Sequence, residues 1–269
     1  MVQRELRKNF RSAKGIVLAV LSLLGGSSVA LLLVKYQEFK RQELGELTPE
    51  QIHDLREKAL AKIYDPAMAK SLADSPEVLL ALLGLTIWLT PMLVALMGFD
   101  SVAPDIQHRS VRYWTLRTRR WSYFLGKWAG LWATVSIVTF AMDALIWIVC
   151  IARGEASFGA TLGYGFKFWL VSLPMSAIWC GIATLMSSLF RSPILALLLT
   201  FAAFFVIWVV YLIALVSGAD AVAYIYPNHY DHLLLHPHAH KLGMGLGACL
   251  GMAALYVGAG SFFFTKRDV

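Results

Sequence analysis

Five of the chain's seven histidines fall within twelve consecutive residues, and such a density could hold a metal ion. They are His229, His232, His236, His238 and His240, with Asp231 among them. Imidazole nitrogens are common ligands of zinc, copper and nickel. On a helix His229 would share a face with His232, and His232 with His236. The sequence therefore predicts a candidate copper or zinc site, and a membrane-embedded metal-binding protein or metalloenzyme is one reading of the whole chain.

Two other interpretations of the histidines stay open. Pro237 divides the group, and a stretch rich in histidine can simply be a polar loop. The ordinary histidine pKa near 6.5 would also suit a gate that responds to pH. The frame H-E-x-x-H, in which two histidines bind zinc and a glutamate acts as base, is absent from the sequence.

Asp143 lies well inside an apolar run, where a charge costs about 2.5–3.5 kcal/mol on insertion scales. Such a residue is a candidate functional group by default. It could also be protonated and hydrogen-bonded to a neighbouring helix, or paired with Lys167. We favour a structural role for Asp143.

The segment 100–127 mixes six basic residues with aromatic and aliphatic ones, and Pro104 interrupts the helix expected before it. Aromatic side chains supply contact area and arginines supply directed polar contacts, so this composition favours a protein-docking surface. The alternative is a belt of Trp and Tyr at the level of the lipid headgroups.

The composition requires a membrane. Hydrophobic residues make up 58% of the 269 residues and charged ones 15%, against about 45–50% and about 25% in soluble domains. A span needs roughly 20 apolar residues. The chain is therefore expected to be a single all-α transmembrane domain, residues 1–269, with six spans at 16–34, 78–99, 128–152, 168–190, 194–216 and 242–264.

The basic residues lie beside these runs, which explains the net charge of +7 by topology and excludes a nucleic-acid binder. Both termini are then cytoplasmic.

Residues 1–14 have near-helical apolar spacing, which predicts an interfacial helix or simply a basic flank. The outer loops would be 35–77 and 217–241, and in the first Thr48, Pro49 and Gln51 predict a capped helix.

Small residues recur at four-residue spacing in the last apolar run, at Gly243, Gly247 and Gly251. Such a stripe lets two helices approach closely. Packing within the bundle is the first expectation and a dimer interface the second. The three cysteines lie singly in separate runs, and we interpret them as packing residues.

Between the second and third predicted spans the chain resembles the membrane subunits of type-two ABC exporters. That family carries an acidic residue there, then a pattern such as G-T-L-x-x-L-L-x-x-P-x-S-R, and then G-K at the next helix start. Asp105 stands in the acidic place, Arg109-Ser110-Val111 where G-T-L is usual, Arg120 at the closing arginine and Gly126-Lys127 at G-K. Arg109 thus replaces the usual glycine, and Arg117 replaces the usual proline.

The order of features along the chain adds to the resemblance, which is to the branch linked to maturation of multicopper enzymes. It implies a cytoplasmic coupling helix at about 104–120 that docks on a separate ATPase subunit. The implied docking residues are Asp105, Arg109, Arg112, Tyr113, Trp114, Arg117, Arg119 and Arg120.

The resemblance further implies two ATPase subunits that bind ATP and Mg, a second permease copy or a sister permease, and a bacterial plasma membrane. This chain has no G-x-x-x-x-G-K-[ST] phosphate loop, so we expect no ATPase activity and no cofactor of its own by that route. A secondary transporter or channel is a weaker alternative, since we find no inverted repeat.

Overall fold

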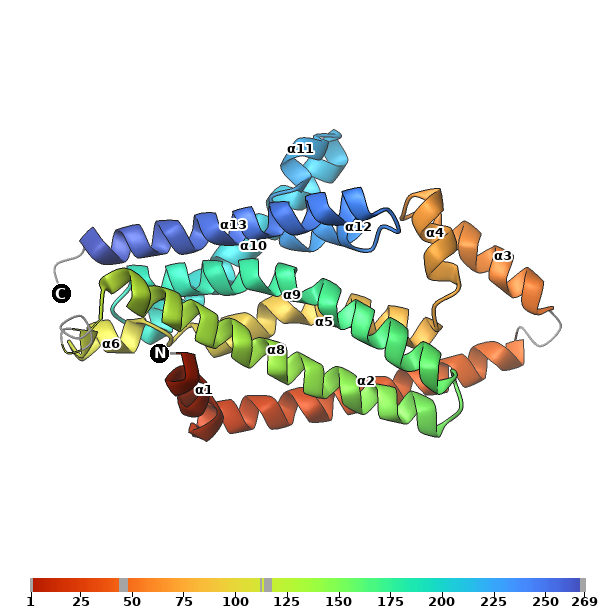
Figure 1. The fold of residues 1–269 in the computed structure, drawn as a ribbon, viewed down its shortest axis with the longest axis horizontal. Coiled ribbons are helices and arrows are strands. Elements are labelled where there is room, and N and C mark those ends of the chain that lie inside the picture. Colours follow the sequence, from red (N-terminus) through yellow and green to blue (C-terminus); the bar gives the residue numbers. More distant parts are fainter. Residues whose placement is uncertain (1, 44–47, 112, 114–117, 267–269) are drawn as a thin grey trace.

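The computed structural model describes residues 2–43, 48–111, 113 and 118–266. Within these ranges the chain forms α-helices and one 3₁₀ turn, and no strand. The long helices run side by side in an elongated bundle, with α1, α6 and the C-terminus at one end and α3 and α4 at the other (Figure 1). The elements are α1 (Val2–Arg11), α2 (Ala13–Glu43), α3 (Pro49–Leu60), α4 (Pro66–Ala73), α5 (Glu77–Gly98), α6 (Ala103–Gln107), α8 (Arg120–Ala152), α9 (Phe158–Leu189), α10 (Pro193–Ser217), α11 (Asp220–Ala223), η1 (Pro227–Tyr230), α12 (Asp231–Leu234) and α13 (Ala239–Lys266).

Five of these helices, α5, α8, α9, α10 and α13, are long and apolar enough to cross a membrane. The chain is therefore a multi-pass membrane protein, as its composition predicts. The remaining predicted span, 16–34, falls within α2. The apolar stretch found there in the described residues, Lys14–Gly26, is shorter than a span, so the count of six stays a prediction.

The helices are longer than the apolar runs that predict them. Helix α8 begins at Arg120, not at residue 128, and α9 begins at Phe158, not at residue 168. With a rise of 1.5 Å per residue, the 33 residues of α8 extend about 50 Å, well beyond a hydrocarbon core of about 30 Å. An apolar run marks only the part of a helix that suits lipid, whereas the backbone hydrogen bonds continue into polar flanks.

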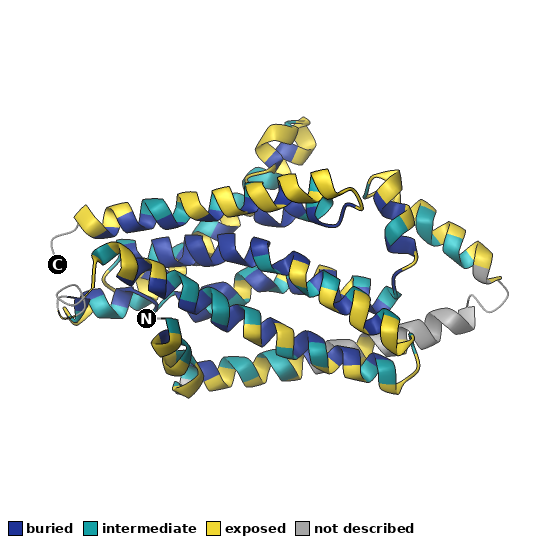
Figure 2. Ribbon diagram, in the orientation of Figure 1, coloured by how far each residue is buried: buried dark blue, intermediate teal, exposed yellow. Residues whose placement is uncertain are grey.

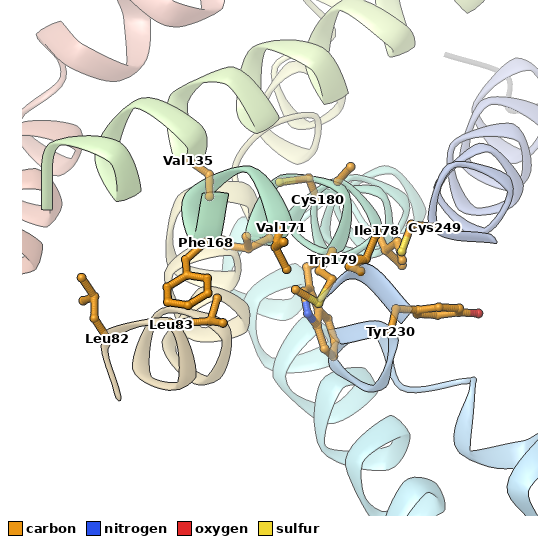
Figure 3. Close-up of a cluster of buried hydrophobic side chains, with 14 of the residues drawn as sticks. Leu82, Leu83, Val135, Phe168, Val171, Ile178, Trp179, Cys180, Tyr230 and Cys249 are labelled. Atoms are coloured by element: carbon orange, nitrogen blue, oxygen red, sulfur yellow. The ribbon is translucent and has the colours of Figure 1, made fainter. Parts of the chain in front are cut away.

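Helix α9 is the centre of the bundle, with α5, α8, α10 and α13 packed against it. Figure 2 shows it as largely buried, whereas the outer faces of α10 and α13 are exposed. Trp179 of α9 is completely buried and stacks edge-on against Phe204 of α10, with ring centroids 4.6 Å apart. The core around it brings together residues of several helices, among them Val135, Phe168 and Cys249 (Figure 3).

The cysteines have the packing role that the sequence predicts. Cys150, Cys180 and Cys249 are all buried and none forms a disulfide. Cys180 of α9 and Cys249 of α13 belong to the same hydrophobic core (Figure 3).

The small-residue stripe of α13 does not pack inside the bundle, which corrects the first expectation. A Cβ atom added at Gly243, Gly247 or Gly251 would meet no atom within 4 Å. The face of α13 that packs on the bundle carries Cys249 and Ala253 instead. Cys249 lies two residues from Gly247 and from Gly251, and Ala253 lies two residues from Gly251. At 3.6 residues per turn, an offset of two residues turns a side chain to the opposite side of the helix.

At the end opposite α6, short helices are joined to the bundle by polar contacts. Helix α3 begins with the predicted capping box, in which Thr48 and Gln51 exchange hydrogen bonds of 2.9 and 3.4 Å. Asn228 of η1 accepts a hydrogen bond from the Trp179 indole at 2.9 Å and donates to the carbonyl of Ile87 at 3.0 Å. These buried hydrogen bonds fix η1 between α5 and α9.

Candidate functional site

Helix α6, within the predicted coupling segment, is held at its first turn by Ser187 of α9. The Ser187 hydroxyl accepts hydrogen bonds from the backbone N–H groups of Val102 and Ala103, both at 3.0 Å, and donates to the carbonyl of Phe99 at 2.8 Å. The first N–H groups of a helix have no partner within the helix. Ser187 supplies one from another helix and thereby joins α6 to the centre of the bundle.

Next to α6 lies a group of buried charges that sequence analysis did not identify. The Lys127 ammonium lies 2.7 Å from a carboxylate oxygen of Asp105 and 3.0 Å from one of Glu5. The Tyr123 hydroxyl donates to the same Asp105 oxygen. Only 3% of the Lys127 side chain and 5% of the Glu5 side chain are exposed. We call Glu5, Asp105, Tyr123 and Lys127 the buried charge cluster.

The buried charge cluster joins three helices that are far apart in the sequence, because Glu5 belongs to α1, Asp105 to α6, and Lys127 to α8. Removing a charge from water costs several kcal/mol, and an opposite charge at hydrogen-bond distance offsets that cost only while both partners stay in place. Separating α1 or α6 from α8 would therefore expose Lys127 without its partner. The cluster fixes the relative positions of the three helices.

Helix α1 packs closely against α8. A Cβ atom added at Gly130 would lie 2.6 Å from the Cβ atom of Glu5, so only glycine leaves room for α1 there. Asn9 donates a hydrogen bond to the Thr134 hydroxyl at 3.0 Å. The predicted N-terminal helix therefore exists, as α1, with one face on the bundle; its position in a membrane surface stays a prediction.

A left-handed turn follows α6 at the position where the related exporters have glycine. Arg109 has a φ of 54°, in the region that glycine adopts most easily. The Ser110 hydroxyl closes this turn by donating to an oxygen of the Asp105 carboxylate at 3.0 Å. Arg109 therefore adopts a backbone conformation that glycine would adopt without steric strain.

The side of this segment that faces the bundle is apolar. Ile106 and Val111 are buried against Phe124 of α8 and Phe264 of α13. Arg120, at the start of α8, donates to the carbonyl of Thr265 at 2.7 Å, which ties the segment to the end of α13. One side of the segment is thus fully used in packing.

The predicted docking residues divide into three groups. Arg109, Tyr113 and Arg119 are exposed, Tyr113 to 75%, and we call them the exposed basic face. Asp105 and Arg120 are used within the protein, so they are anchoring residues and their predicted docking role has no support in the geometry. Arg112, Trp114 and Arg117 lie outside the described residues.

Asp143 forms a hydrogen bond between two helices, and its structural role stays a prediction. It is buried in α8 and accepts a hydrogen bond from the Thr86 hydroxyl of α5 at 3.2 Å. No ion pair with Lys167 is present within the described part of the chain. A small cavity of about 10 Å³ adjoins Asp143 and Trp147, whose buried indole N–H has no acceptor among the described residues. Asp143 therefore joins α8 to α5.

The structure separates the five histidines. The rings of His229 and His232 lie 5.1 Å apart beside Asp231, whereas those of His236 and His238, on the two sides of Pro237 in the sequence, lie 4.9 Å apart. His240 is exposed at the start of α13. Across the described residues no three His, Cys, Asp or Glu side chains converge as a metal site requires. The geometry does not support the predicted copper or zinc site, and no function is built on it.

Comparison with known protein families matches residues 1–269 to the ABC-2 family transporter protein. A search of curated proteins gave no match to this sequence. The family match covers the whole chain, agrees with the helical membrane architecture and confirms the resemblance drawn from segment 100–127. This protein belongs to the ABC-2 family of transporter membrane proteins.

Proposed function

We propose that this chain is the membrane-spanning subunit of an ABC exporter and that a separate ATPase subunit drives it. The ABC-2 family is a family of transport components. The sequence has no phosphate loop of the G-x-x-x-x-G-K-[ST] type. ATP and Mg would bind the partner, and this chain would convert the partner's movement into substrate movement across the membrane.

The observation that carries the proposal is the two-sided construction of the segment after α5. Its inner side is anchored by Ser187, by the buried charge cluster and by the apolar contacts of Ile106. Its outer side presents Arg109, Tyr113 and Arg119. Arginine and aromatic side chains are common at the centres of protein interfaces, and a backbone anchored at α6 and at the start of α8 loses less freedom on binding than a free loop does.

The buried charge cluster would transmit the movement. A force on α6 reaches α8 through the Asp105–Lys127 ion pair and α1 through the Glu5–Lys127 ion pair. A second route leads through Ser187 to α9. Transport requires that docking contacts differ between two states of the assembly, and these links would let several spans respond together.

We propose the following assembly. Helix α2 is the first of six spans, and both termini lie in the cytoplasm of a bacterial cell, whose plasma membrane holds two permease subunits with two ATPase subunits. The open stripe of Gly243, Gly247 and Gly251 supports a contact between permeases, because small residues let membrane helices approach closely. The second permease is a copy of this chain or a sister subunit.

Affinity purification from membranes of the native host tests the proposal. The wild-type chain is expected to capture a protein with a phosphate-loop motif, and the double variant Arg109→Glu/Arg119→Glu to capture at least tenfold less of it. The matched control is Arg191→Glu, which reverses an exposed arginine in the short link between α9 and α10. Arg120 is left unchanged because it supports the end of α13.

The amount of ATPase recovered decides the outcome. Equal capture by the wild type and the double variant would exclude the exposed basic face as the docking site. Equal loss in Arg191→Glu would show a general effect of charge and would contradict the assignment in the same way.

A further inference from the structure

A pocket of about 320 Å³ lies at the end of the bundle opposite α6, which is within the size range of small-molecule sites. It is bounded by α5, by α10 and by the segments that carry Tyr64 and η1. The polar and aromatic side chains that line it are Tyr64, Trp88, Tyr211, Tyr226, Asn228, His229, Asp231 and His232. Neither the family match nor the proposed coupling role assigns a function to this pocket.

The pocket contains a carboxylate without a strong cationic partner. Asp231 accepts a hydrogen bond from the His232 backbone N–H at 2.7 Å and one from the Tyr64 hydroxyl at 3.4 Å. In the described ranges no lysine or arginine nitrogen lies within 4 Å of it, and its nearest basic group is the His232 imidazole at 3.6 Å. Burial raises the pKa of Asp231, as expected for a carboxyl group that lacks a full counter-charge.

The rest of the lining is aromatic. The rings of Tyr211 and Tyr226 stack with their centroids 4.6 Å apart, and Tyr64 lies 5.0 Å from the ring of His232. The faces of aromatic rings attract cations, and cages of such rings recognise quaternary ammonium groups. The buried Nδ1 atom of His229, which also lines the pocket, has no hydrogen-bond partner among the described residues. A polar atom in this position can bind a hydroxyl or an N–H group of a ligand.

We propose that this pocket binds an organic ammonium ion, whose charge lies next to Asp231 and whose alkyl groups contact Tyr211, Tyr226 and Trp88. A metal ion fits the pocket poorly, because no three His, Cys, Asp or Glu side chains converge in the part of the chain that the structure describes. A neutral apolar molecule would leave Asp231 buried without a counter-charge. An ammonium ion with small alkyl groups satisfies the carboxylate and the aromatic rings together. The inference is independent of ATPase docking, since binding is measured on this chain alone.

Equilibrium dialysis with radiolabelled choline, on the full chain purified in maltoside detergent, tests the proposal. The comparison compound is 3,3-dimethyl-1-butanol, which has the shape of choline without its charge. Choline is expected to bind at one site per chain, and a hundredfold excess of the neutral compound to leave that binding unchanged. Competition by the neutral compound at the same concentration as unlabelled choline would overturn the proposal.

Two variants locate the site. Asp231→Asn removes the charge at nearly constant size and is expected to weaken choline binding at least tenfold. Gly84 lines the pocket, and a Cβ atom added there meets no atom within 4 Å, so Gly84→Leu can fill part of the pocket while the charge of Asp231 stays in place. It is expected to weaken binding similarly. Asp65→Asn is the matched control and is expected to bind as the wild type does, since Asp65 is a neighbouring exposed carboxylate outside the pocket.

Wild-type affinity in both Asp231→Asn and Gly84→Leu would overturn the assignment, as would an equal loss in Asp65→Asn. Thermal unfolding of each variant distinguishes lost binding from lost folding, and Gly84→Leu keeps the test valid if Asp231→Asn does not fold.

A second experiment, in lipid nanodiscs, shows whether the ammonium group belongs to a lipid headgroup or to a free amine. In nanodiscs of phosphatidylglycerol, which lacks an ammonium group, choline binding is expected to persist. Its loss in nanodiscs of phosphatidylcholine would identify a lipid headgroup as the occupant, and its persistence there would identify a free amine.

Discussion

The charged side chains at the two ends of the molecule differ in how they are paired and in how far they are exposed. At the α6 end Glu5 and Lys127 are buried, and Lys127 forms ion pairs with Glu5 and with the half-buried Asp105. At the opposite end 41% of the Lys241 side chain and 60% of its ion-pair partner Asp65 are exposed. The half-buried carboxylate of Asp231 there has no lysine or arginine partner in the described ranges. Charges that pair internally fix the positions of helices, whereas a buried charge without a strong partner can receive a ligand. We propose that the first end transmits movement and that the second binds a ligand.

The largest effect is expected from Lys127→Ala. It leaves the buried Glu5 and the half-buried Asp105 without their cation, and breaking a buried ion pair in this way costs about 3–5 kcal/mol. The measurement is denaturant unfolding of the purified chain in detergent. The triple variant Glu5→Gln/Asp105→Asn/Lys127→Met, which removes all the charges together, is expected to recover most of the loss. If Lys127→Ala unfolds like the wild type, the cluster does not hold the three helices together.

A smaller effect is expected from Gly130→Ala. The new Cβ atom would lie 2.6 Å from the Cβ atom of Glu5, so α1 must move away from α8, and overpacking of this kind costs about 1–3 kcal/mol. Alanine also favours a helix over glycine by up to about 1 kcal/mol. Gly247→Ala isolates that gain, because nothing lies within 4 Å of the added Cβ atom. The same change in unfolding free energy for both variants would show that α1 is not packed on Gly130.

The smallest effect is expected from Asp65→Asn, at the opposite end. Exposed ion pairs contribute about 0.2–1 kcal/mol. A hydrogen bond from Lys241 lowers the pKa of Asp65, so the stability that this pair provides is present above the unfolded pKa near 3.9 and is lost as the pH falls below it. The difference between variant and wild type should therefore be constant from pH 7 to pH 5 and vanish near pH 2. A loss above 2 kcal/mol would contradict the contrast between the two ends.

Sequence patterns predicted those parts of the fold that depend on neighbouring residues. Five apolar runs lie within long helices, and the capping box of Thr48 and Gln51 forms as its spacing indicates. Helix ends were predicted less well, because the sequence marks where lipid-compatible residues stop and not where backbone hydrogen bonds stop. Arg120 and Phe158 begin their helices eight to ten residues before the apolar runs.

The candidate site was predicted only in part, for a physical reason. From the sequence, Lys127 was interpreted only as part of a helix start. In the structure it forms an ion pair with Glu5, which is distant in the sequence. Glu5 lies in a segment with five basic residues, so the sequence does not indicate which of them, if any, it pairs with. One signal was available: a lysine within a strongly apolar helix and a single acidic residue in a basic one each need a partner. The left-handed turn at Arg109 could have been predicted from the family pattern, because that pattern has glycine at this position and glycine adopts positive φ most easily.

The central claim is that the exposed basic face contacts an ATPase, and photo-crosslinking in cells of the native host tests it most directly. A photoreactive phenylalanine analogue replaces Tyr113 in one variant and Tyr224, a partly exposed residue at the opposite end, in the other. The account predicts a crosslinked product that contains the permease and a phosphate-loop ATPase from position 113 and none from position 224. The absence of that product at position 113, or its equal formation at position 224, would contradict it.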